Sequence, residues 1–207
     1  MRDARQMRTV DAQFTTRNDS ENPCIEGYFA VFNSNYDIGM GMSESIAPHA
    51  FDNTLSDDIR ALINHDTTLV LGRTSAHTLE LRQDEHGLWG HIDINPNDSD
   101  AMNLYARVQR GDVTQCSFGF DILDEETEYR GENEVHWTIK EVKLYEVSCC
   151  TFPAYQETAI KARQEDLAEI KKRELEAWKI NMKKRLKGEL TDGAQSINSE
   201  EEPSGED

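Results

Sequence analysis

The chain has 207 residues, of which 40 are acidic and 22 are basic, giving a net charge of −18 with 37% hydrophobic residues. This is the composition of a soluble globular protein that can bury a core without metal or disulfide support. A strongly acidic surface repels phosphate backbones, which argues against nucleic acid as a ligand. No apolar stretch approaches the roughly 18 residues that cross a membrane, so no membrane partner is expected.

The four cysteines have no C-x-x-C spacing, and two of them, Cys149 and Cys150, are adjacent. Adjacent cysteines are poorly placed to bridge one another, so the sequence predicts reduced thiols in a cytosolic protein. The first nine residues contain three arginines but no apolar run after them, unlike a secretion signal.

Residues 1–23 are polar and are predicted to form a flexible N-terminal segment, and 33–47 read as a long loop. Proline at position 48 suits the first turn of a short helix over 48–55. A helix cap at 98–100 predicts a helix that ends near Arg110, before Gly111. Alternating or β-branched apolar residues predict strands at 25–32, 59–63, 68–72, 79–81, 88–94, 115–122, 135–142 and 143–152.

The C-terminal part of the chain has a different character. Apolar residues at steps of three or four, without Gly or Pro, predict an amphipathic helical tail over 159–187 that could bind a partner or form a coiled coil. Residues 161–187 carry ten basic and five acidic side chains, which favours a solvated helix face. Residues 188–207 are rich in Gly, Ser and Glu and are predicted to be an acidic disordered tail.

About seven short strands with few helices predict an α+β, mainly β fold. We expect a closed or nearly closed β-barrel surrounded by a few helices, followed by the C-terminal helical tail. The domain that carries the function is expected to span residues 24–158.

His65 is the first candidate for chemistry, because it lies between two predicted strands in an Asn-His-Asp sequence. A histidine at a strand end can project into a cleft and act as a general base near neutral pH. Taken by its position alone, it is more often a surface turn residue.

Ser117 is the second candidate, in the sequence Cys116-Ser117-Phe118-Gly119-Phe120. Side chains alternate along a strand, so the two phenylalanines share one face and Ser117 takes the other. Gly119 follows on the face of Ser117, where it would leave room for a substrate backbone. Cys116 is a rival nucleophile, but strand geometry turns it away from Ser117 and into the core. A serine on the wet face of a strand is the plainer interpretation of Ser117 alone.

Glu146 is the third candidate, on the predicted strand 143–152. A carboxylate among apolar neighbours needs a partner if it is buried, and an imidazole would serve. An exposed strand glutamate is the more common case. The histidines share no ligand spacing with one another or with a cysteine, so the sequence predicts no metal site and no cofactor.

Four ordered groups of residues resemble the prohead protease family of tailed phages. They are 26–33 (EGYFAVFN), 59–66 (IRALINHD) with 71–74 (LGRT), 117–120 (SFGF), and 146–148 (EVS) with 151–155 (TFPAY).

The resemblance implies a fold similar to the herpesvirus assembly proteases and a serine endopeptidase packaged inside the procapsid, in the host bacterial cytoplasm. Such enzymes cut scaffold or the scaffold-like part of the major capsid protein, and commonly themselves. The family pattern makes His65 the base and Ser117 the nucleophile. Herpesvirus enzymes have a second histidine where this chain has Glu146, and a paired arginine segment where it has 151–154. The similarity also favours a homodimer.

Two other functions stay open at this point. A non-enzymatic assembly protein could retain the fold and act through its helical tail, although the presence of both His65 and Ser117 argues against it. A cysteine peptidase could use Cys116, and thiol alkylation in a Ser117→Ala background would reveal it.

Overall fold

The structure is a computed structural model that describes residues 6–11, 14–17, 23–131, 134–152 and 156–186. The chain divides into two compact units, Met1–Arg163 and Gln164–Asp207. The predicted acidic tail, 188–207, lies outside the described residues. Neither described helix combines the length and the apolar character that crossing a membrane requires.

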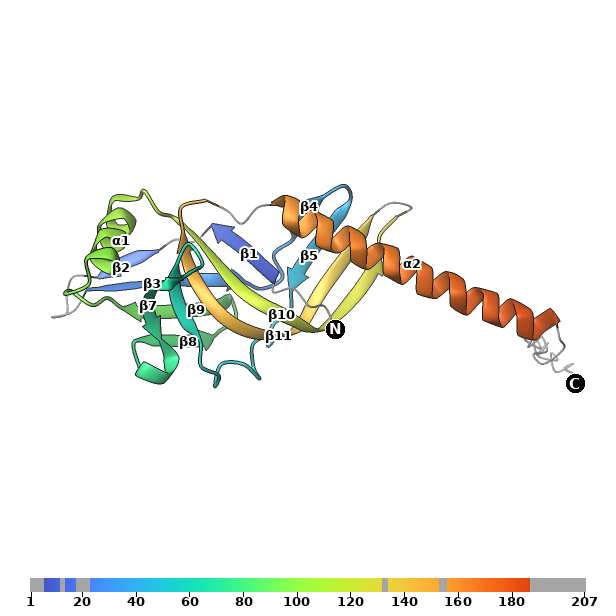
Figure 1. Cartoon of the computed structure of the whole chain (residues 1–207), viewed down its shortest axis with the longest axis horizontal. Helices are drawn as coiled ribbons and strands as arrows, with labels where there is room; N and C mark the ends of the chain where they lie inside the picture. Colours follow the sequence, from blue (N-terminus) through green and yellow to red (C-terminus); the bar gives the residue numbers. More distant parts are fainter. Residues whose placement is uncertain (1–5, 12–13, 18–22, 132–133, 153–155, 187–207) are drawn as a thin grey trace, which may run out of the picture. The chain divides into compact units, whose positions relative to one another are not determined.

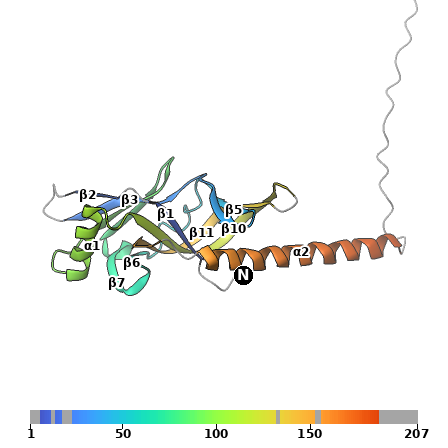
Figure 2. The same ribbon diagram turned by 90° about the horizontal axis from the view of Figure 1, so that it is seen from above.

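Two long antiparallel strands, β10 (Gln115–Tyr129) and β11 (Val135–Cys150), lie at the centre of a seven-stranded mixed sheet (Figures 1 and 2). Along the other edge of β10 runs β1 (Gln6–Asp11), antiparallel. Two short strands pair parallel with successive parts of β11, and each has an antiparallel partner of its own. They are β5 (Met42–Ile46) with β4 (Tyr36–Gly39), and β6 (Arg60–Ile63) with β7 (Asp66–Arg73).

The second sheet is antiparallel and has four strands in the order β2–β3–β9–β8. The strands are β2 (Thr15–Arg17), β3 (Cys24–Val31), β9 (Gly87–Asp93) and β8 (Leu79–Gln83). The expectation of a closed or nearly closed barrel is therefore wrong. Although the described chain is mainly β, its strands are shared between two open sheets, and neither sheet joins its own edges by hydrogen bonds.

Apolar side chains from both sheets meet in one core. Phe29 of β3 and Phe118 and Phe120 of β10 are fully buried, as is Phe51 from the turns after β5. The Phe118 ring lies 4.8 Å from Phe120 and 5.8 Å from Phe51, centroid to centroid. The strand that carries Ser117 is thus fixed by its aromatic side chains, because aromatic pairs at these separations pack favourably.

The helix over 98–110 forms as predicted. In α1 (Ser99–Arg110) the Asp98 carboxylate accepts hydrogen bonds from the N–H groups of Asp100 and Ala101, and Gly111 ends the helix with a φ of 85°. The short 3₁₀ helix η1 (Thr74–Ala76) leads from β7 toward β8.

Three other segments differ from expectation. The segment 33–47 contains the hairpin β4–β5, whose turn has positive φ at Gly39, Met40 and Gly41. The segment 48–55 forms successive turns and no helix, and 1–23 contains β1 and β2. In the segments that form strands, pairing with a long strand supplies what the local sequence does not signal, as β1 pairs with β10 and β5 with β11.

A buried ion cluster lies where α2 (Gln156–Leu186) begins. Arg163 is 1% exposed, donates to Glu44 and Glu125 at 2.8 Å, and stacks over the Trp137 ring. Glu44 also accepts hydrogen bonds from the guanidinium of Arg8, which lies on β1. Burial raises the pKa of the Glu44 carboxyl, but the charges and hydrogen bonds of the two arginines outweigh it, so that pKa lies below its ordinary value.

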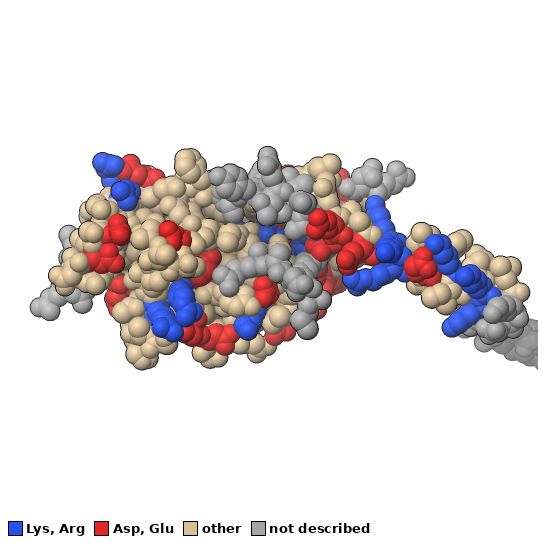
Figure 3. Space-filling view, viewed as in Figure 1, with Lys and Arg blue, Asp and Glu red and all other residues tan. Residues whose placement is uncertain are grey.

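Beyond Arg163 the helix continues through Leu186 in the second unit. Trp178 and Leu175 are at least half exposed there. Figure 3 shows Lys and Arg side chains along this part of the chain. A helix with apolar and basic side chains in solvent is typical of a partner-binding segment.

Candidate functional site

His65 lies in a two-residue turn that joins β6 to β7. Asn64 and His65 occupy the turn with φ values of 49° and 62°. A type I′ hairpin turn requires positive φ at both central residues, and asparagine and histidine are among the non-glycine residues that most often adopt it. The Asn64 side chain accepts hydrogen bonds from Thr151, and the backbone N–H of Asn64 donates to the Cys149 carbonyl. The turn is therefore tied to the end of β11.

The His65 imidazole contacts a buried carboxylate from β11. His65 Nδ1 lies 2.6 Å from Glu146 Oε1, and the two side chains are 18% and 5% exposed. Ser148 donates from its hydroxyl to the other carboxylate oxygen at 2.6 Å, and the His65 N–H donates to the same hydroxyl at 3.2 Å. Glu146 and Ser148 are two residues apart on one strand face, so together they fix both the ring and the backbone of His65.

Ser117 lies on the neighbouring strand, on the same face. It pairs with Ser148, and Gly119 pairs with Glu146 in the β10–β11 ladder. Directly opposed residues have Cα atoms about 4.5–5.5 Å apart and share a face. On this face the Ser117–Ser148 pair is therefore next to the Gly119–Glu146 pair, whose glutamate contacts His65. Its hydroxyl is fully buried and has no hydrogen-bond partner among the described residues. The structure thus brings His65 and Glu146 together, whereas Ser117 makes no hydrogen bond to His65.

Gly119 has a different neighbour from the one expected. A Cβ atom at this position would lie 2.5 Å from Glu146 Oε1. The space beside the glycine therefore holds the carboxylate that contacts His65, where a substrate backbone was expected.

Two cysteines lie near the site and differ in direction. Cys116 points away from Ser117 and donates to the Tyr28 and Phe29 carbonyls, as strand alternation predicts. Cys150 Sγ lies 3.8 Å from His65 Nε2. Burial, and after it the charge of Glu146, raises the pKa of the Cys150 thiol to about 12, so this thiol stays protonated at neutral pH.

Sequence reasoning missed Ser148 and the turn contacts of Asn64. Ser148 is two residues after Glu146 in a strand, which places both on one face, and that spacing could have identified it. The Thr151 N–H donates to Asn64 Oδ1 and is already used. This N–H is therefore not a spare donor for an oxyanion. Of the described residues, those whose donor atoms could hold a metal ion are Cys24, Glu26 and His91, in the other sheet.

The contact of an imidazole with a buried carboxylate is one of the two hydrogen bonds of a serine-hydrolase triad, and the other, between a serine and the imidazole, is not formed by Ser117 in this structure. A family model described as caudovirus prohead serine protease matches residues 9–173. The chain therefore belongs to the caudovirus prohead serine protease family.

Two known proteins are similar to the chain. The prohead protease of Enterobacteria phage HK97 is 31% identical over 157 residues, which are 74% of this chain and 64% of that protein. The chain thus spans somewhat less than two thirds of the length of this relative. The solved structure of the bacteriophage T4 capsid assembly protease has a TM-score of 0.41 and 9% identity, over 70% of this chain and 98% of that one.

Proposed function

We propose that the chain is a serine endopeptidase that cleaves the capsid or scaffold protein of a tailed phage inside the procapsid, in the host bacterial cytoplasm. Ser117 is the nucleophile, His65 is the general base, and Glu146 holds His65. The 2.6 Å contact between His65 and Glu146, residues 81 positions apart in the chain, carries the proposal. The family match and the name of the HK97 relative support the same activity and substrates.

In the proposed reaction, Ser117 Oγ attacks the scissile carbonyl carbon while His65 Nε2 takes the hydroxyl proton. Glu146 accepts a hydrogen bond from Nδ1–H of His65, which fixes the tautomer and stabilises the imidazolium. The imidazolium then gives its proton to the leaving amine, and an ester of Ser117 remains. Water, deprotonated by His65, hydrolyses the ester and restores the serine.

The buried hydroxyl of Ser117 requires a local rearrangement before this reaction. His65 Nε2 has the Cys150 thiol beside it, whereas Ser117 Oγ has no partner among the described residues. The proposed reaction requires the imidazole to exchange its contact with Cys150 for a hydrogen bond with Ser117. Catalytic hydrogen bonds often form only when substrate binds, so this geometry is compatible with an enzyme at rest.

Co-expression with the cognate capsid protein tests the assignment. Ser117→Ala is expected to lower the cleavage rate by roughly 10⁴–10⁶-fold while shells still assemble. The matched control is Cys116→Ala on the core face of the same strand, which should still cleave. Cleavage by Ser117→Ala that thiol alkylation abolishes would replace the proposal with a cysteine peptidase.

Labelling with a serine-directed phosphonate separates the enzyme from a non-enzymatic assembly protein. The parent chain should be labelled at Ser117, and Ser117→Ala should not. A folded parent chain that supports shell assembly but is neither labelled nor able to cleave would favour the assembly protein.

The helical tail is assigned to scaffold docking or to self-cleavage. High concentration within a closed shell would make weak docking sufficient. Mass spectrometry of the purified enzyme is expected to show a product that lacks part of residues 155–207, and an intact chain after long incubation would contradict self-cleavage. We also propose a homodimer, which sedimentation can test.

A further inference from the structure

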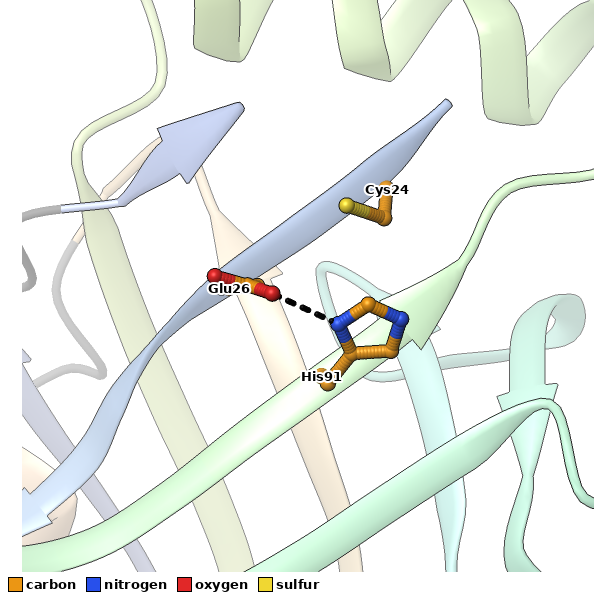
Figure 4. A group of neighbouring side chains, drawn as sticks. All are labelled: Cys24, Glu26 and His91. Carbon is orange, nitrogen blue, oxygen red and sulfur yellow. Dashed lines mark hydrogen bonds and ion pairs between the residues drawn. The ribbon is translucent and has the colours of Figure 1, made fainter. Parts of the chain in front are cut away.

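A second cluster of chemically active side chains lies in the four-stranded sheet, apart from His65 and Glu146. Figure 4 shows Cys24 and Glu26 on β3 and His91 on the neighbouring β9. In the antiparallel ladder Cys24 pairs with Asp93, and Glu26 pairs with His91. Because opposed residues share a face and alternate residues of a strand return to it, all four side chains lie on one face.

The donor atoms of three of these residues are already close together. The Cys24 sulfur, a Glu26 carboxylate oxygen and a His91 ring nitrogen all lie within 4.8 Å of one another. Tetrahedral zinc with bonds of about 2.0–2.3 Å needs donors about 3.3–3.6 Å apart. The distance from Glu26 Oε1 to His91 Nδ1 is 2.9 Å, so small side-chain rotations would open or close the cluster to that spacing.

Asp93 is placed to orient the imidazole. Its carboxylate oxygen lies 3.1 Å from His91 Nε2, on the ring nitrogen that does not face Glu26. In the structure Nδ1–H donates to Glu26, and a cation bound at Nδ1 would replace that proton. An Nε2–H bond to Asp93 would then hold the tautomer whose Nδ1 lone pair binds the cation. Histidine ligands of metals in proteins usually have a carboxylate or carbonyl partner on the other nitrogen.

Burial gives the cluster an enclosed side and an open side. Cys24 and Glu26 are 4% and 8% exposed, whereas the His91 side chain is 26% exposed. Two buried donors need little further desolvation to bind a cation, and the exposed imidazole leaves a path from solvent. Both strands are held by cross-strand hydrogen bonds, so the ligands come from rigid elements.

We propose that Cys24, Glu26 and His91 bind a zinc ion through Sγ, a carboxylate oxygen and Nδ1, with Asp93 orienting the imidazole and water completing the coordination. One thiolate, one imidazole and one carboxylate form a donor set suited to zinc, whereas calcium and magnesium prefer oxygen ligands alone. The site joins β3 to β9 and is expected to stabilise this sheet.

An ion-pair cluster without metal is the competing explanation, since His91 contacts both carboxylates. The two explanations differ at Cys24, because a thiol is needed as a ligand but contributes little to a salt bridge. Cobalt substitution therefore discriminates between them. Tetrahedral Co²⁺ bound to a thiolate has an intense charge-transfer band in the near ultraviolet.

The experiment uses the full chain, stripped with a chelator and titrated with Co²⁺ and then Zn²⁺. We expect one equivalent of Co²⁺ with a thiolate band, displacement by Zn²⁺, and a higher melting temperature with Zn²⁺. Cys24→Ser should abolish the band, and His91→Ala should weaken binding at least about tenfold. The matched controls Cys116→Ala, Cys149→Ala and Cys150→Ala should retain the band, which excludes the other three thiols as its source.

Two results would overturn the proposal. One is a parent chain that binds no stoichiometric Co²⁺, and the other is a Cys24→Ser chain that keeps both the band and the affinity. If circular dichroism shows that Cys24→Ser is unfolded, the Co²⁺ affinity of Glu26→Gln tests the site in its place. This change keeps the size of the side chain and removes a charged ligand. Unchanged Co²⁺ affinity in Glu26→Gln would then refute the site.

Discussion

Replacing Gly119 with alanine should disconnect His65 from Glu146 without removing either residue. The added Cβ would lie 2.5 Å from Glu146 Oε1 and 3.2 Å from Glu146 Cδ, whereas ordinary contacts begin near 3.4 Å. The oxygen must therefore retreat by about 1 Å, and it is the oxygen that contacts His65 Nδ1. Displacements of about 1 Å at a catalytic group lower rates by on the order of 10²-fold. We expect this loss in kcat, with little change in KM.

The fold should survive the Gly119→Ala change. Gly119 is in β10 and is not among the residues with positive φ, so the backbone accepts alanine without strain. Gly131→Ala is the matched control, because the nearest atom to its added Cβ would be 3.8 Å away. Cleavage of capsid protein gives the rate, and the proton resonance of His65 Nδ1 reports its contact with Glu146. A Gly119→Ala enzyme with the parent's kcat and an unchanged resonance would refute the steric reasoning.

Other changes test the same site and the ion cluster. Glu146→Gln should lower kcat by up to about 10⁴-fold because it disturbs the imidazole tautomer, and a rate near that of the parent would exclude Glu146 as the third member. Ser148→Ala removes one hydrogen bond to the carboxylate and should lower kcat about tenfold, measured in the same cleavage assay; an equal rate would mean that Ser148 is not needed to hold Glu146. Glu44→Gln should lower the free energy of unfolding by about 3–5 kcal/mol at neutral pH, because it leaves two buried arginines poorly paired. Since the folded-state pKa of Glu44 is lowered, its contribution is present above the unfolded value of about 4.3 and is lost as pH falls through the folded value, so denaturant titrations of parent and variant should converge in acid.

The local structure around the candidate residues was predictable because it depends on local patterns. Alternation along 115–122 placed Cys116 and Ser117 on opposite faces, and the polar Asn-His pair between two apolar runs marked the β6–β7 turn. The approach of His65 to Glu146 was not predictable from the residues alone, because it depends on parallel pairing between β6 and β11. Such pairing leaves no signal in a single sequence, and the family resemblance supplied what the periodicity could not.

The division of the strands between two sheets could not be predicted from the sequence for a related reason. The short strands β4 and β5 carry few apolar residues; β5 pairs with the long strand β11, and β4 pairs with β5. The local pattern predicted 135–142 and 143–152 as separate strands. In the structure they belong to one strand, β11, which pairs with β10, β5 and β6. A barrel was therefore expected where two open sheets share the core. The cluster of Cys24, Glu26 and His91 was not predictable from the sequence, because β3 and β9 bring its members together across a ladder and not along the chain.

The shared carboxylate of Glu44 joins two parts of the chain that lie outside residues 24–158. Arg8 reaches it from before residue 24, and Arg163 reaches it from after residue 158. A fragment limited to residues 24–158, the domain suggested by the motifs, would lose both cations and keep a buried anion. A cut between Arg8 and residue 24, or between residue 158 and Arg163, would separate one arginine from Glu44, whereas a cut after Arg163 would leave the ion cluster whole.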